Sequence, residues 1–193
     1  MTTKDNTSHI KNISSIDRIF RNCIKLTDLD FSMYDAHGVP RYNFNNLNTA
    51  IEAFSGCEKL KKISFIDNVN FSNLTDFNNG FFNCKSLTSI FDNDFNKAPI
   101  FYDAEGATKE LNFNSLFLNC EKLASLGSLT FADLRRVKQF KGFLSNCQQI
   151  GSNKDWEIKQ NMLNPQLELD TLTGVLDLTN IKFGDYLIMD EAF

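Results

Sequence analysis

Apolar residues recur at fixed offsets before a short phrase that the chain repeats five times. The phrase is a Phe or Leu, two further residues and a Cys, and it ends at Cys23, Cys57, Cys84, Cys120 and Cys147. Apolar or small residues stand ten, seven, four and three positions before the Cys, although Glu110 breaks this pattern in the fourth copy. Steps of three and four place side chains on one face of a helix. The pattern therefore predicts a short amphipathic helix of about three turns before each Cys.

The pattern changes after each Cys. A Leu or Ile follows three residues later, and apolar and polar residues then alternate in Leu29–Phe31 and Ile63–Phe65, as in a half-buried strand. The residue directly before each Cys is Asn or Gly, the residue types that tolerate positive φ and commonly end helices. These five residues are expected to be left-handed: Asn22, Gly56, Asn83, Asn119 and Asn146. Each copy is therefore predicted to form a helix, a tight turn and a strand.

Units of this kind can bury their apolar faces only by stacking on one another. The sequence therefore predicts an α/β solenoid of about five helix-turn-strand coils, with the strands paired in parallel on one face. We expect an N-terminal lead-in over residues 1–12, the solenoid over 13–158 and a C-terminal capping segment over 159–193, where the repeat decays. Terminal repeats are usually atypical because they must close the core.

The pattern Phe/Leu-x-x-Cys-x-x-Leu/Ile resembles the BspA-like leucine-rich repeats, which occur in bacterial surface and lipoprotein families and in some eukaryotic parasites. The likeness covers roughly residues 13–158. It implies a leucine-rich-repeat solenoid, and for function it implies protein or cell-surface binding without a catalytic motif. Many relatives are exported, whereas this chain begins with polar residues and shows no apolar secretory segment. Cell surface, virion and cytoplasm therefore all stay open as locations.

Charge and cysteine placement narrow the classes of partner. The chain has 24 Asp and Glu against 20 Lys and Arg, and this acidic balance disfavours a nucleic-acid partner. The five cysteines are expected to be buried, reduced and aligned, since parallel coils suit disulfide geometry poorly. We expect no metal and no cofactor, because the chain lacks a Cys-x-x-Cys pair and has only His9 and His37. We also expect no membrane insertion, because no apolar run is long enough.

Two insertions are the candidate recognition sites. The cysteines are 34, 27, 36 and 27 residues apart, so the first and third intervals carry extra residues. Both insertions hold a Pro, a Gly and a Tyr-Asp-Ala triplet, and equivalent insertions in a solenoid emerge on the same side. Aromatic and Arg side chains commonly anchor interfaces. The candidate partner-binding residues are Tyr34, His37, Arg41, Tyr42, Phe101 and Tyr102. The alternative is that these aromatic residues pack back on the coils.

A search for catalytic motifs finds no nucleophile elbow, phosphate loop, dinucleotide fingerprint or zinc-protease helix. His37 lies close to Asp35, and such a pair could transfer protons, although a surface histidine is the commoner situation. We therefore expect a non-catalytic protein-binding repeat module, adhesin-like or host-facing, that recognises its partner through the insertion loops. The alternative is a structural component of a larger assembly, such as a phage or virion protein, that self-assembles through the C-terminal cap. An enzyme is the third interpretation.

Overall fold

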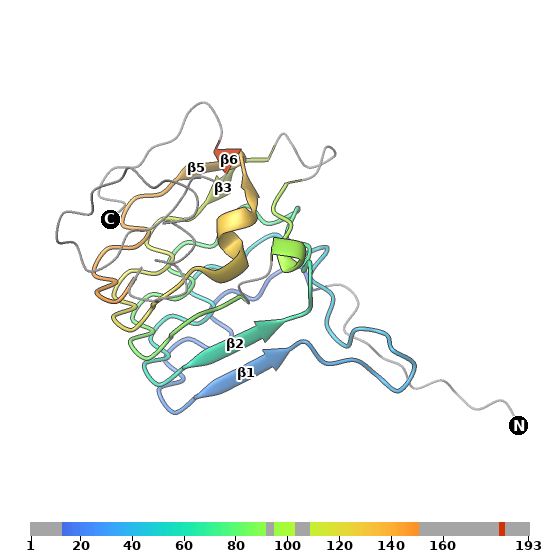
Figure 1. Cartoon of the computed structure of the whole chain (residues 1–193), viewed down its shortest axis with the longest axis horizontal. Coiled ribbons are helices and arrows are strands. Elements are labelled where there is room, and N and C mark those ends of the chain that lie inside the picture. Colours follow the sequence, from blue (N-terminus) through green and yellow to red (C-terminus); the bar gives the residue numbers. More distant parts are fainter. Residues whose placement is uncertain (1–12, 92–94, 103–108, 151–181, 184–193) are drawn as a thin grey trace, which may run out of the picture.

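The chain winds into successive coils that lie one above another (Figure 1). The computed structural model describes residues 13–91, 95–102, 109–150 and 182–183. The predicted lead-in and nearly all of the predicted capping segment lie outside these residues. We name the coils 1 to 5 after the cysteines that they contain, from Cys23 in coil 1 to Cys147 in coil 5.

Short strands and two 3-10 helices are the regular elements of this stack. They are β1 (Asp28–Phe31), β2 (Lys62–Phe65), η1 (Phe95–Lys97), β3 (Leu111–Asn112), η2 (Gly127–Phe131), β4 (Asp133–Leu134), β5 (Val137–Gln139) and β6 (Lys182–Phe183). The pairs β1–β2, β3–β5 and β4–β6 are all parallel. The last pair joins coil 5 to a strand from the predicted capping segment.

The register between coils follows the cysteine spacing. A ladder of parallel contacts passes through all five coils at Ser15, Thr49, Asp76, Asn112 and Gln139. Its steps are 34, 27, 36 and 27 residues, the same as the steps between cysteines. Successive copies of the repeat therefore occupy equivalent places. That these coils are leucine-rich repeats stays a prediction.

The predicted helices before the cysteines are wrong, because the described residues contain no α-helix. These segments are runs of tight turns, such as those closed by Ile19 N–H to Ile16 O at 3.2 Å and Cys23 N–H to Phe20 O at 3.0 Å. Positive φ recurs at the residue before each Cys, as predicted: Asn22, Gly56, Asn83, Asn119 and Asn146. It also recurs four residues earlier, at Arg18, Glu52, Asn79, Ser115 and Gly142. Positive φ at the third residue of a turn is the geometry of type II turns.

Backbone bonds between coils explain why these segments are not helical. An α-helix uses each N–H group within its own segment. Here the N–H group of Phe20 instead donates to Ala53 O in the next coil, at 2.9 Å. Four such bonds, from alternate residues, occur at each of the four junctions between coils. The backbone is thus satisfied by stacking.

Columns of phenylalanine fill the space inside the coils. The rings of Phe20, Phe54, Phe81 and Phe117 form one such column. Their centroids are 5.6, 4.9 and 5.5 Å apart and each pair is tilted by only 9°. Two further columns run through Phe31, Phe65 and Phe91, and through Phe44, Phe71 and Phe101. A fully buried Phe contributes about 1.5–3 kcal/mol. These columns account for many of the nineteen Phe residues.

The buried cysteines connect neighbouring coils. Each thiol donates to the carbonyl oxygen of the Phe in the preceding coil, as Cys57 does to Phe20 at 3.0 Å and Cys120 to Phe81 at 3.1 Å. Cys84 and Cys147 make the same contact. The prediction that all five cysteines are buried is wrong for Cys23, which is exposed. The described residues provide no coil before coil 1 to cover its thiol.

Candidate functional site

The first insertion forms a hairpin that projects past the end of β1 (Figure 1). We call residues 33–41 the insertion hairpin. Tyr34 and Pro40 form an antiparallel bridge. Arg41 N–H donates to Met33 O at 2.9 Å, and Asp35 N–H donates to Val39 O at 2.8 Å. These contacts give the projecting segment a defined backbone.

Asp35 shapes the tip of the hairpin. Its Oδ1 atom accepts the backbone N–H groups of His37 at 2.8 Å and Val39 at 2.9 Å. Gly38 then takes a φ of 75°, which glycine tolerates without steric cost. The carboxylate that the sequence placed beside His37 for acid/base chemistry therefore has a structural role in the turn.

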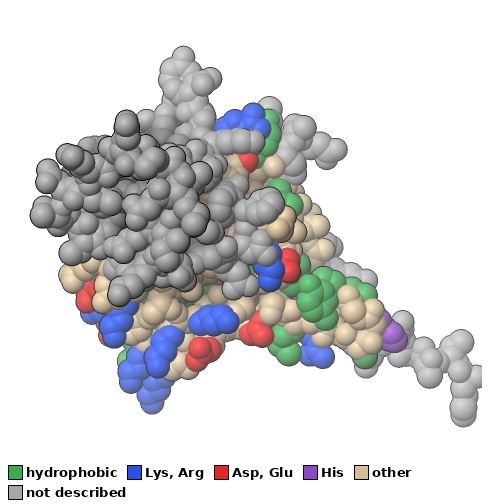
Figure 2. All heavy atoms as spheres, in the orientation of Figure 1, with side chains coloured by type: hydrophobic (Ala, Val, Ile, Leu, Met, Phe, Trp, Pro, Cys, Tyr) green, Lys and Arg blue, Asp and Glu red, His purple; other side chains and the backbone are tan. Residues whose placement is uncertain are grey.

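The hairpin exposes apolar side chains together with basic ones. Tyr34 is 51% exposed, and Met33 and Val39 are also exposed. His37 and Arg41 are exposed beside them. Figure 2 shows hydrophobic side chains gathered on this side of the molecule, next to the histidine. Three of the six predicted contact residues, Tyr34, His37 and Arg41, thus lie together on one projecting surface.

Two other predicted contact residues belong to the packing. Phe101 is only 2% exposed, and its ring stacks on Phe71 at 5.4 Å, so the expectation that it contacts a partner is wrong. Tyr42 is half-buried and meets the ring of Phe31 edge-on at 5.2 Å. Both aromatic side chains pack back on the coils, the alternative that the sequence had left open.

Tyr102 does not occupy the place in its coil that Tyr34 occupies in its own. It is half-buried, and the guanidinium of Arg135 lies 4.1 Å above its ring. Tyr102 follows Phe101, whereas Tyr34 precedes Phe44, and these two phenylalanines share one column. The Tyr-Asp-Ala triplets are therefore not at equivalent points of their coils, which corrects the prediction. The rest of the second triplet lies outside the described residues.

Arg136 is a buried cation that sequence reasoning missed. It is 2% exposed, and its guanidinium donates to the carbonyl oxygens of Lys109 at 2.6 Å, Phe101 at 2.7 Å and Leu74 at 2.8 Å, and also to that of Ser72. It thereby joins both flanks of the second insertion to coil 3. In the sequence it stands beside Arg135, and a pair of arginines ordinarily indicates an exposed surface.

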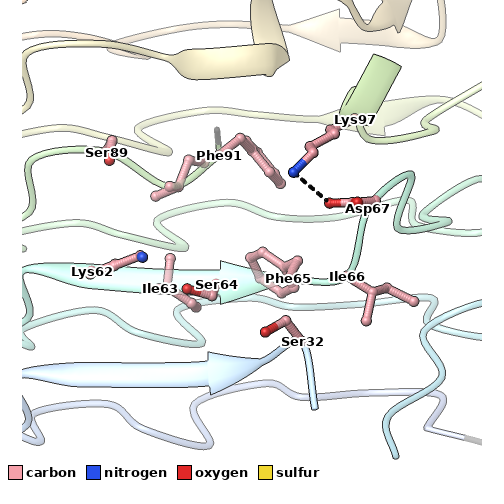
Figure 3. Close-up of a pocket in the computed structure, with 11 residues that line it drawn as sticks. Ser32, Lys62, Ile63, Ser64, Phe65, Ile66, Asp67, Ser89, Phe91 and Lys97 are labelled. Carbon is pink, nitrogen blue, oxygen red and sulfur yellow. Dashed lines mark ion pairs between the residues drawn. The ribbon is translucent and has the colours of Figure 1, made fainter. Parts of the chain in front are cut away.

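A polar groove of about 290 Å³ crosses the strand face between β2 and coil 3 (Figure 3). Lys62, Ser64 and Ser89 line one part of it. Lys97 and Asp67 face each other at the other end, with Nζ and Oδ1 3.5 Å apart. Hydroxyl and ammonium groups can bind polar ligands, but no pair of these side chains forms a nucleophile and base.

The buried thiols are poor nucleophiles. Burial raises the pKa of Cys57 to about 11 and that of Cys147 to about 12. Burial also raises the pKa of Cys84 and Cys120. Because the thiolate is the reactive form, these four residues are unreactive at neutral pH.

In the part of the chain that the structure describes, no three His, Cys, Asp or Glu side chains cluster as metal ligands would. No helix among those residues has the length and apolar character needed to span a bilayer.

Comparisons with protein-family models, curated proteins and solved structures found no match for this chain. Membership of the BspA-like repeat family therefore stays a prediction that is based on the Phe/Leu-x-x-Cys-x-x-Leu/Ile pattern. The geometry of the described residues is what supports any assignment of function.

Proposed function

We propose that this chain is a non-catalytic protein-binding repeat module of the leucine-rich-repeat type, and that its insertion hairpin contacts the partner. The supporting observation is the exposure of Met33, Tyr34 and Val39 on a projecting segment with a defined backbone. Exposed apolar groups of this kind commonly mark interaction sites.

The hairpin has the chemistry of an interface anchor. Tyr34 offers a large apolar ring with a polar end, and Arg41 can donate to a carboxylate. Aromatic anchors of this kind can each contribute about 2 kcal/mol or more to binding. Since Asp35 already holds the turn, little conformational entropy is lost when a partner binds.

Site-specific photo-cross-linking tests this proposal. A photoreactive phenylalanine replaces Tyr34 in one protein and Thr88, an exposed residue of coil 3, in the matched control. Both are irradiated in an extract of the source cells and of any host cells. We expect a discrete cross-linked species only from position 34, and expect an excess of the Tyr34→Ala protein not to compete it away. Equal labelling from both positions, or from neither, would contradict the proposal.

A structural role in a larger assembly is the second candidate, and one observation favours it. The outer side of coil 1 exposes Ile24, at 55%, together with Ile19 and Cys23. The predicted self-assembly through the C-terminal cap concerns residues outside the described ones. Light scattering over a range of protein concentrations separates the two candidates: a defined oligomer that Ile24→Asp disrupts supports assembly, and a monomer at all concentrations excludes it.

A further inference from the structure

One corner of the stack has the same backbone geometry in four successive coils. The turn that follows each Cys is closed by a hydrogen bond of 3.0 Å from the N–H group three residues later, as in Leu26 to Cys23 O and Leu60 to Cys57 O. Coils 3 and 4 repeat this bond through Leu87 and Leu123. Side chains at the same place in these turns therefore lie above one another.

Lysines concentrate on this corner. Lys25, Lys59 and Lys122 occupy the same turn position in coils 1, 2 and 4. We call the following residues the lysine edge: Lys25, Lys59, Lys61, Lys62, Lys85 and Lys122. All six are exposed. Figure 2 shows basic side chains gathered on the side where β1 and β2 begin, away from the insertion hairpin.

Backbone pairing places the remaining lysines beside this row. Lys61 N–H donates to Thr27 O of coil 1 at 2.7 Å, and Thr88 N–H of coil 3 donates to Lys61 O at 3.2 Å. Lys62 pairs with Asp28 on one side and with Ser89 on the other. Lys62 also lines the polar groove on the strand face. The lysine edge and the groove thus form one continuous surface.

Lysines outnumber carboxylates on the lysine edge, and few of them form ion pairs within the described residues. Lys85 Nζ lies 3.3 Å from Glu58 Oε1, and both groups are about half exposed. The other five lysines make no side-chain hydrogen bond or ion pair there. The nearby carboxylates are Asp28, Glu58 and Glu121 in the same turns, and Asp30 in β1, whose pKa is lowered chiefly by hydrogen bonds from Ser32 and in part by Lys62. Coils are spaced by about 4.7–4.9 Å, so the stacked ammonium groups repel one another. A bound anion would relieve this repulsion.

We propose that the lysine edge binds a linear anionic polysaccharide that bears sulfate or carboxylate groups. The row from Lys25 to Lys122 spans three coil spacings, or about 14 Å, which suits an extended chain of charges. Ser64 and Ser89 in the adjoining groove offer hydroxyl groups to sugar hydroxyls. Non-specific nucleic-acid binders add exposed aromatic residues on which bases stack. The aromatic residues of the adjoining groove, Phe65 and Phe91, are half-buried and pack on each other, and Phe65 also packs on Phe31. This surface is separate from the one proposed to bind protein.

Binding to immobilised heparin at low salt tests the proposal. The wild-type protein should bind despite its net charge of −4, and its affinity should fall steeply as salt is raised. The double variant Lys59→Glu, Lys61→Glu should bind at least about tenfold more weakly, since each basic residue near an anionic surface contributes severalfold to affinity. The matched control Lys109→Glu, Lys141→Glu changes the net charge by the same amount outside the lysine edge. It should bind heparin within about twofold of wild type, because these two lysines would not contact the polysaccharide.

Three further measurements keep the proposal open to refutation. Thermal melting checks folding, and the milder Lys25→Gln and Lys122→Gln variants replace the double variant if it unfolds. The Tyr34→Ala protein should bind heparin like wild type, so failure of the hairpin proposal and failure of this one are distinguishable. No retention of wild type, equal weakening by edge and control variants, or tighter binding to a single-stranded oligonucleotide or to phosphatidylserine vesicles than to heparin would each overturn it.

Discussion

Each buried cysteine links two coils through its thiol. The Phe54 carbonyl, for example, accepts both the Cys57 N–H group at 3.1 Å and the Cys84 thiol at 3.2 Å. The thiol therefore adds a second bond to a carbonyl that already closes a turn. Cysteine suits this place because it is small, apolar and a weak donor.

Thiol labelling checks the cysteine environments. At pH 8 an aromatic disulfide reagent should modify one thiol, Cys23, in the folded protein, because Cys23 is exposed and the other four are buried. In denaturant all five should react. The Cys23→Ala protein should show no fast-reacting thiol. Rapid labelling of a second cysteine in the folded wild-type protein would contradict the described packing.

The same burial predicts an effect of alkaline pH on stability. Folding raises the pKa of Cys57 from its ordinary value of 9.0 to about 11, so the folded state holds this proton more tightly than the unfolded state. The stabilising contribution is complete below pH 9 and is lost as the pH rises through 11. The melting temperature should therefore fall between pH 9 and 11. A protein with Cys57→Ala and Cys147→Ala should show a smaller fall, and an equal fall in both proteins would refute this account.

Each coil has left-handed backbone at two residues. Substitutions there are expected to change the free energy of unfolding in opposite directions, depending on the new side chain. Ser115 has a φ of 54°, a conformation that costs a residue with a Cβ about 1–2 kcal/mol but costs glycine little. Ser115→Gly should therefore raise the free energy of unfolding by up to about 1 kcal/mol. Asn83→Val, at a φ of 58°, should lower it by about 1–2 kcal/mol. Chemical denaturation measures both, and a destabilised Ser115→Gly protein would be the contrary result.

Sequence reasoning located the runs of turns before the cysteines correctly, but it predicted them to be helices. Apolar residues at steps of three and four are shared by an α-helix and by consecutive four-residue turns, so periodicity alone does not separate them. The Asn or Gly before each Cys predicted left-handed backbone correctly. The second left-handed place was not predictable, because Arg18, Glu52 and Ser115 are not residue types that favour positive φ.

Replacing Arg136 by Met is expected to lower the free energy of unfolding far more than replacing its neighbour Arg135. Arg136→Met leaves four buried carbonyl oxygens without the guanidinium, and each such loss costs about 1–3 kcal/mol before relaxation. We therefore expect the free energy of unfolding to fall by about 3 kcal/mol or more. Arg135→Met removes a partly exposed pair with Asp133 and the contact with the Tyr102 ring, and together these should cost about 1 kcal/mol. Urea unfolding compares the two proteins, and similar losses would show that Arg136 does not hold the second insertion to coil 3.

At the scale of the whole molecule, the four junctions between the described coils share one set of contacts. Each has four backbone bonds from alternate residues of the earlier coil to the later one, and one thiol bond from the later coil to the earlier one. The cysteine spacing therefore predicted the register of the stack, because a constant set of contacts requires equivalent residues at each step. It could not place the insertions within a coil, since spacing counts residues and does not say where they leave the repeat. For that reason, the sequence did not show that Tyr42 and Phe101 pack on the coils.

Stability in such a stack should depend on how many neighbours a coil has. The Phe81 ring stacks between Phe54 and Phe117 and is fully buried, whereas Phe20 in coil 1 stacks on Phe54 alone and is half-buried. In repeat proteins, stability is close to a sum over neighbouring units. Phe81→Ala should therefore lower the free energy of unfolding by about 3–5 kcal/mol, as for a fully buried ring.

Phe20→Ala should cost roughly half as much, because about half of its stacking and burial is lost. Hydrogen exchange supplies an independent check, since the N–H groups of Arg18 and Phe20 donate to coil 2 from a coil that has a neighbour on only one side among the described residues. They should exchange faster than those of Asn79 and Phe81, which lie in the middle of the stack. Equal losses of stability, together with equal exchange rates, would contradict one-sided packing of coil 1. Coil 1 would then have to be covered on its outer side, where Ile19 and Ile24 are now exposed.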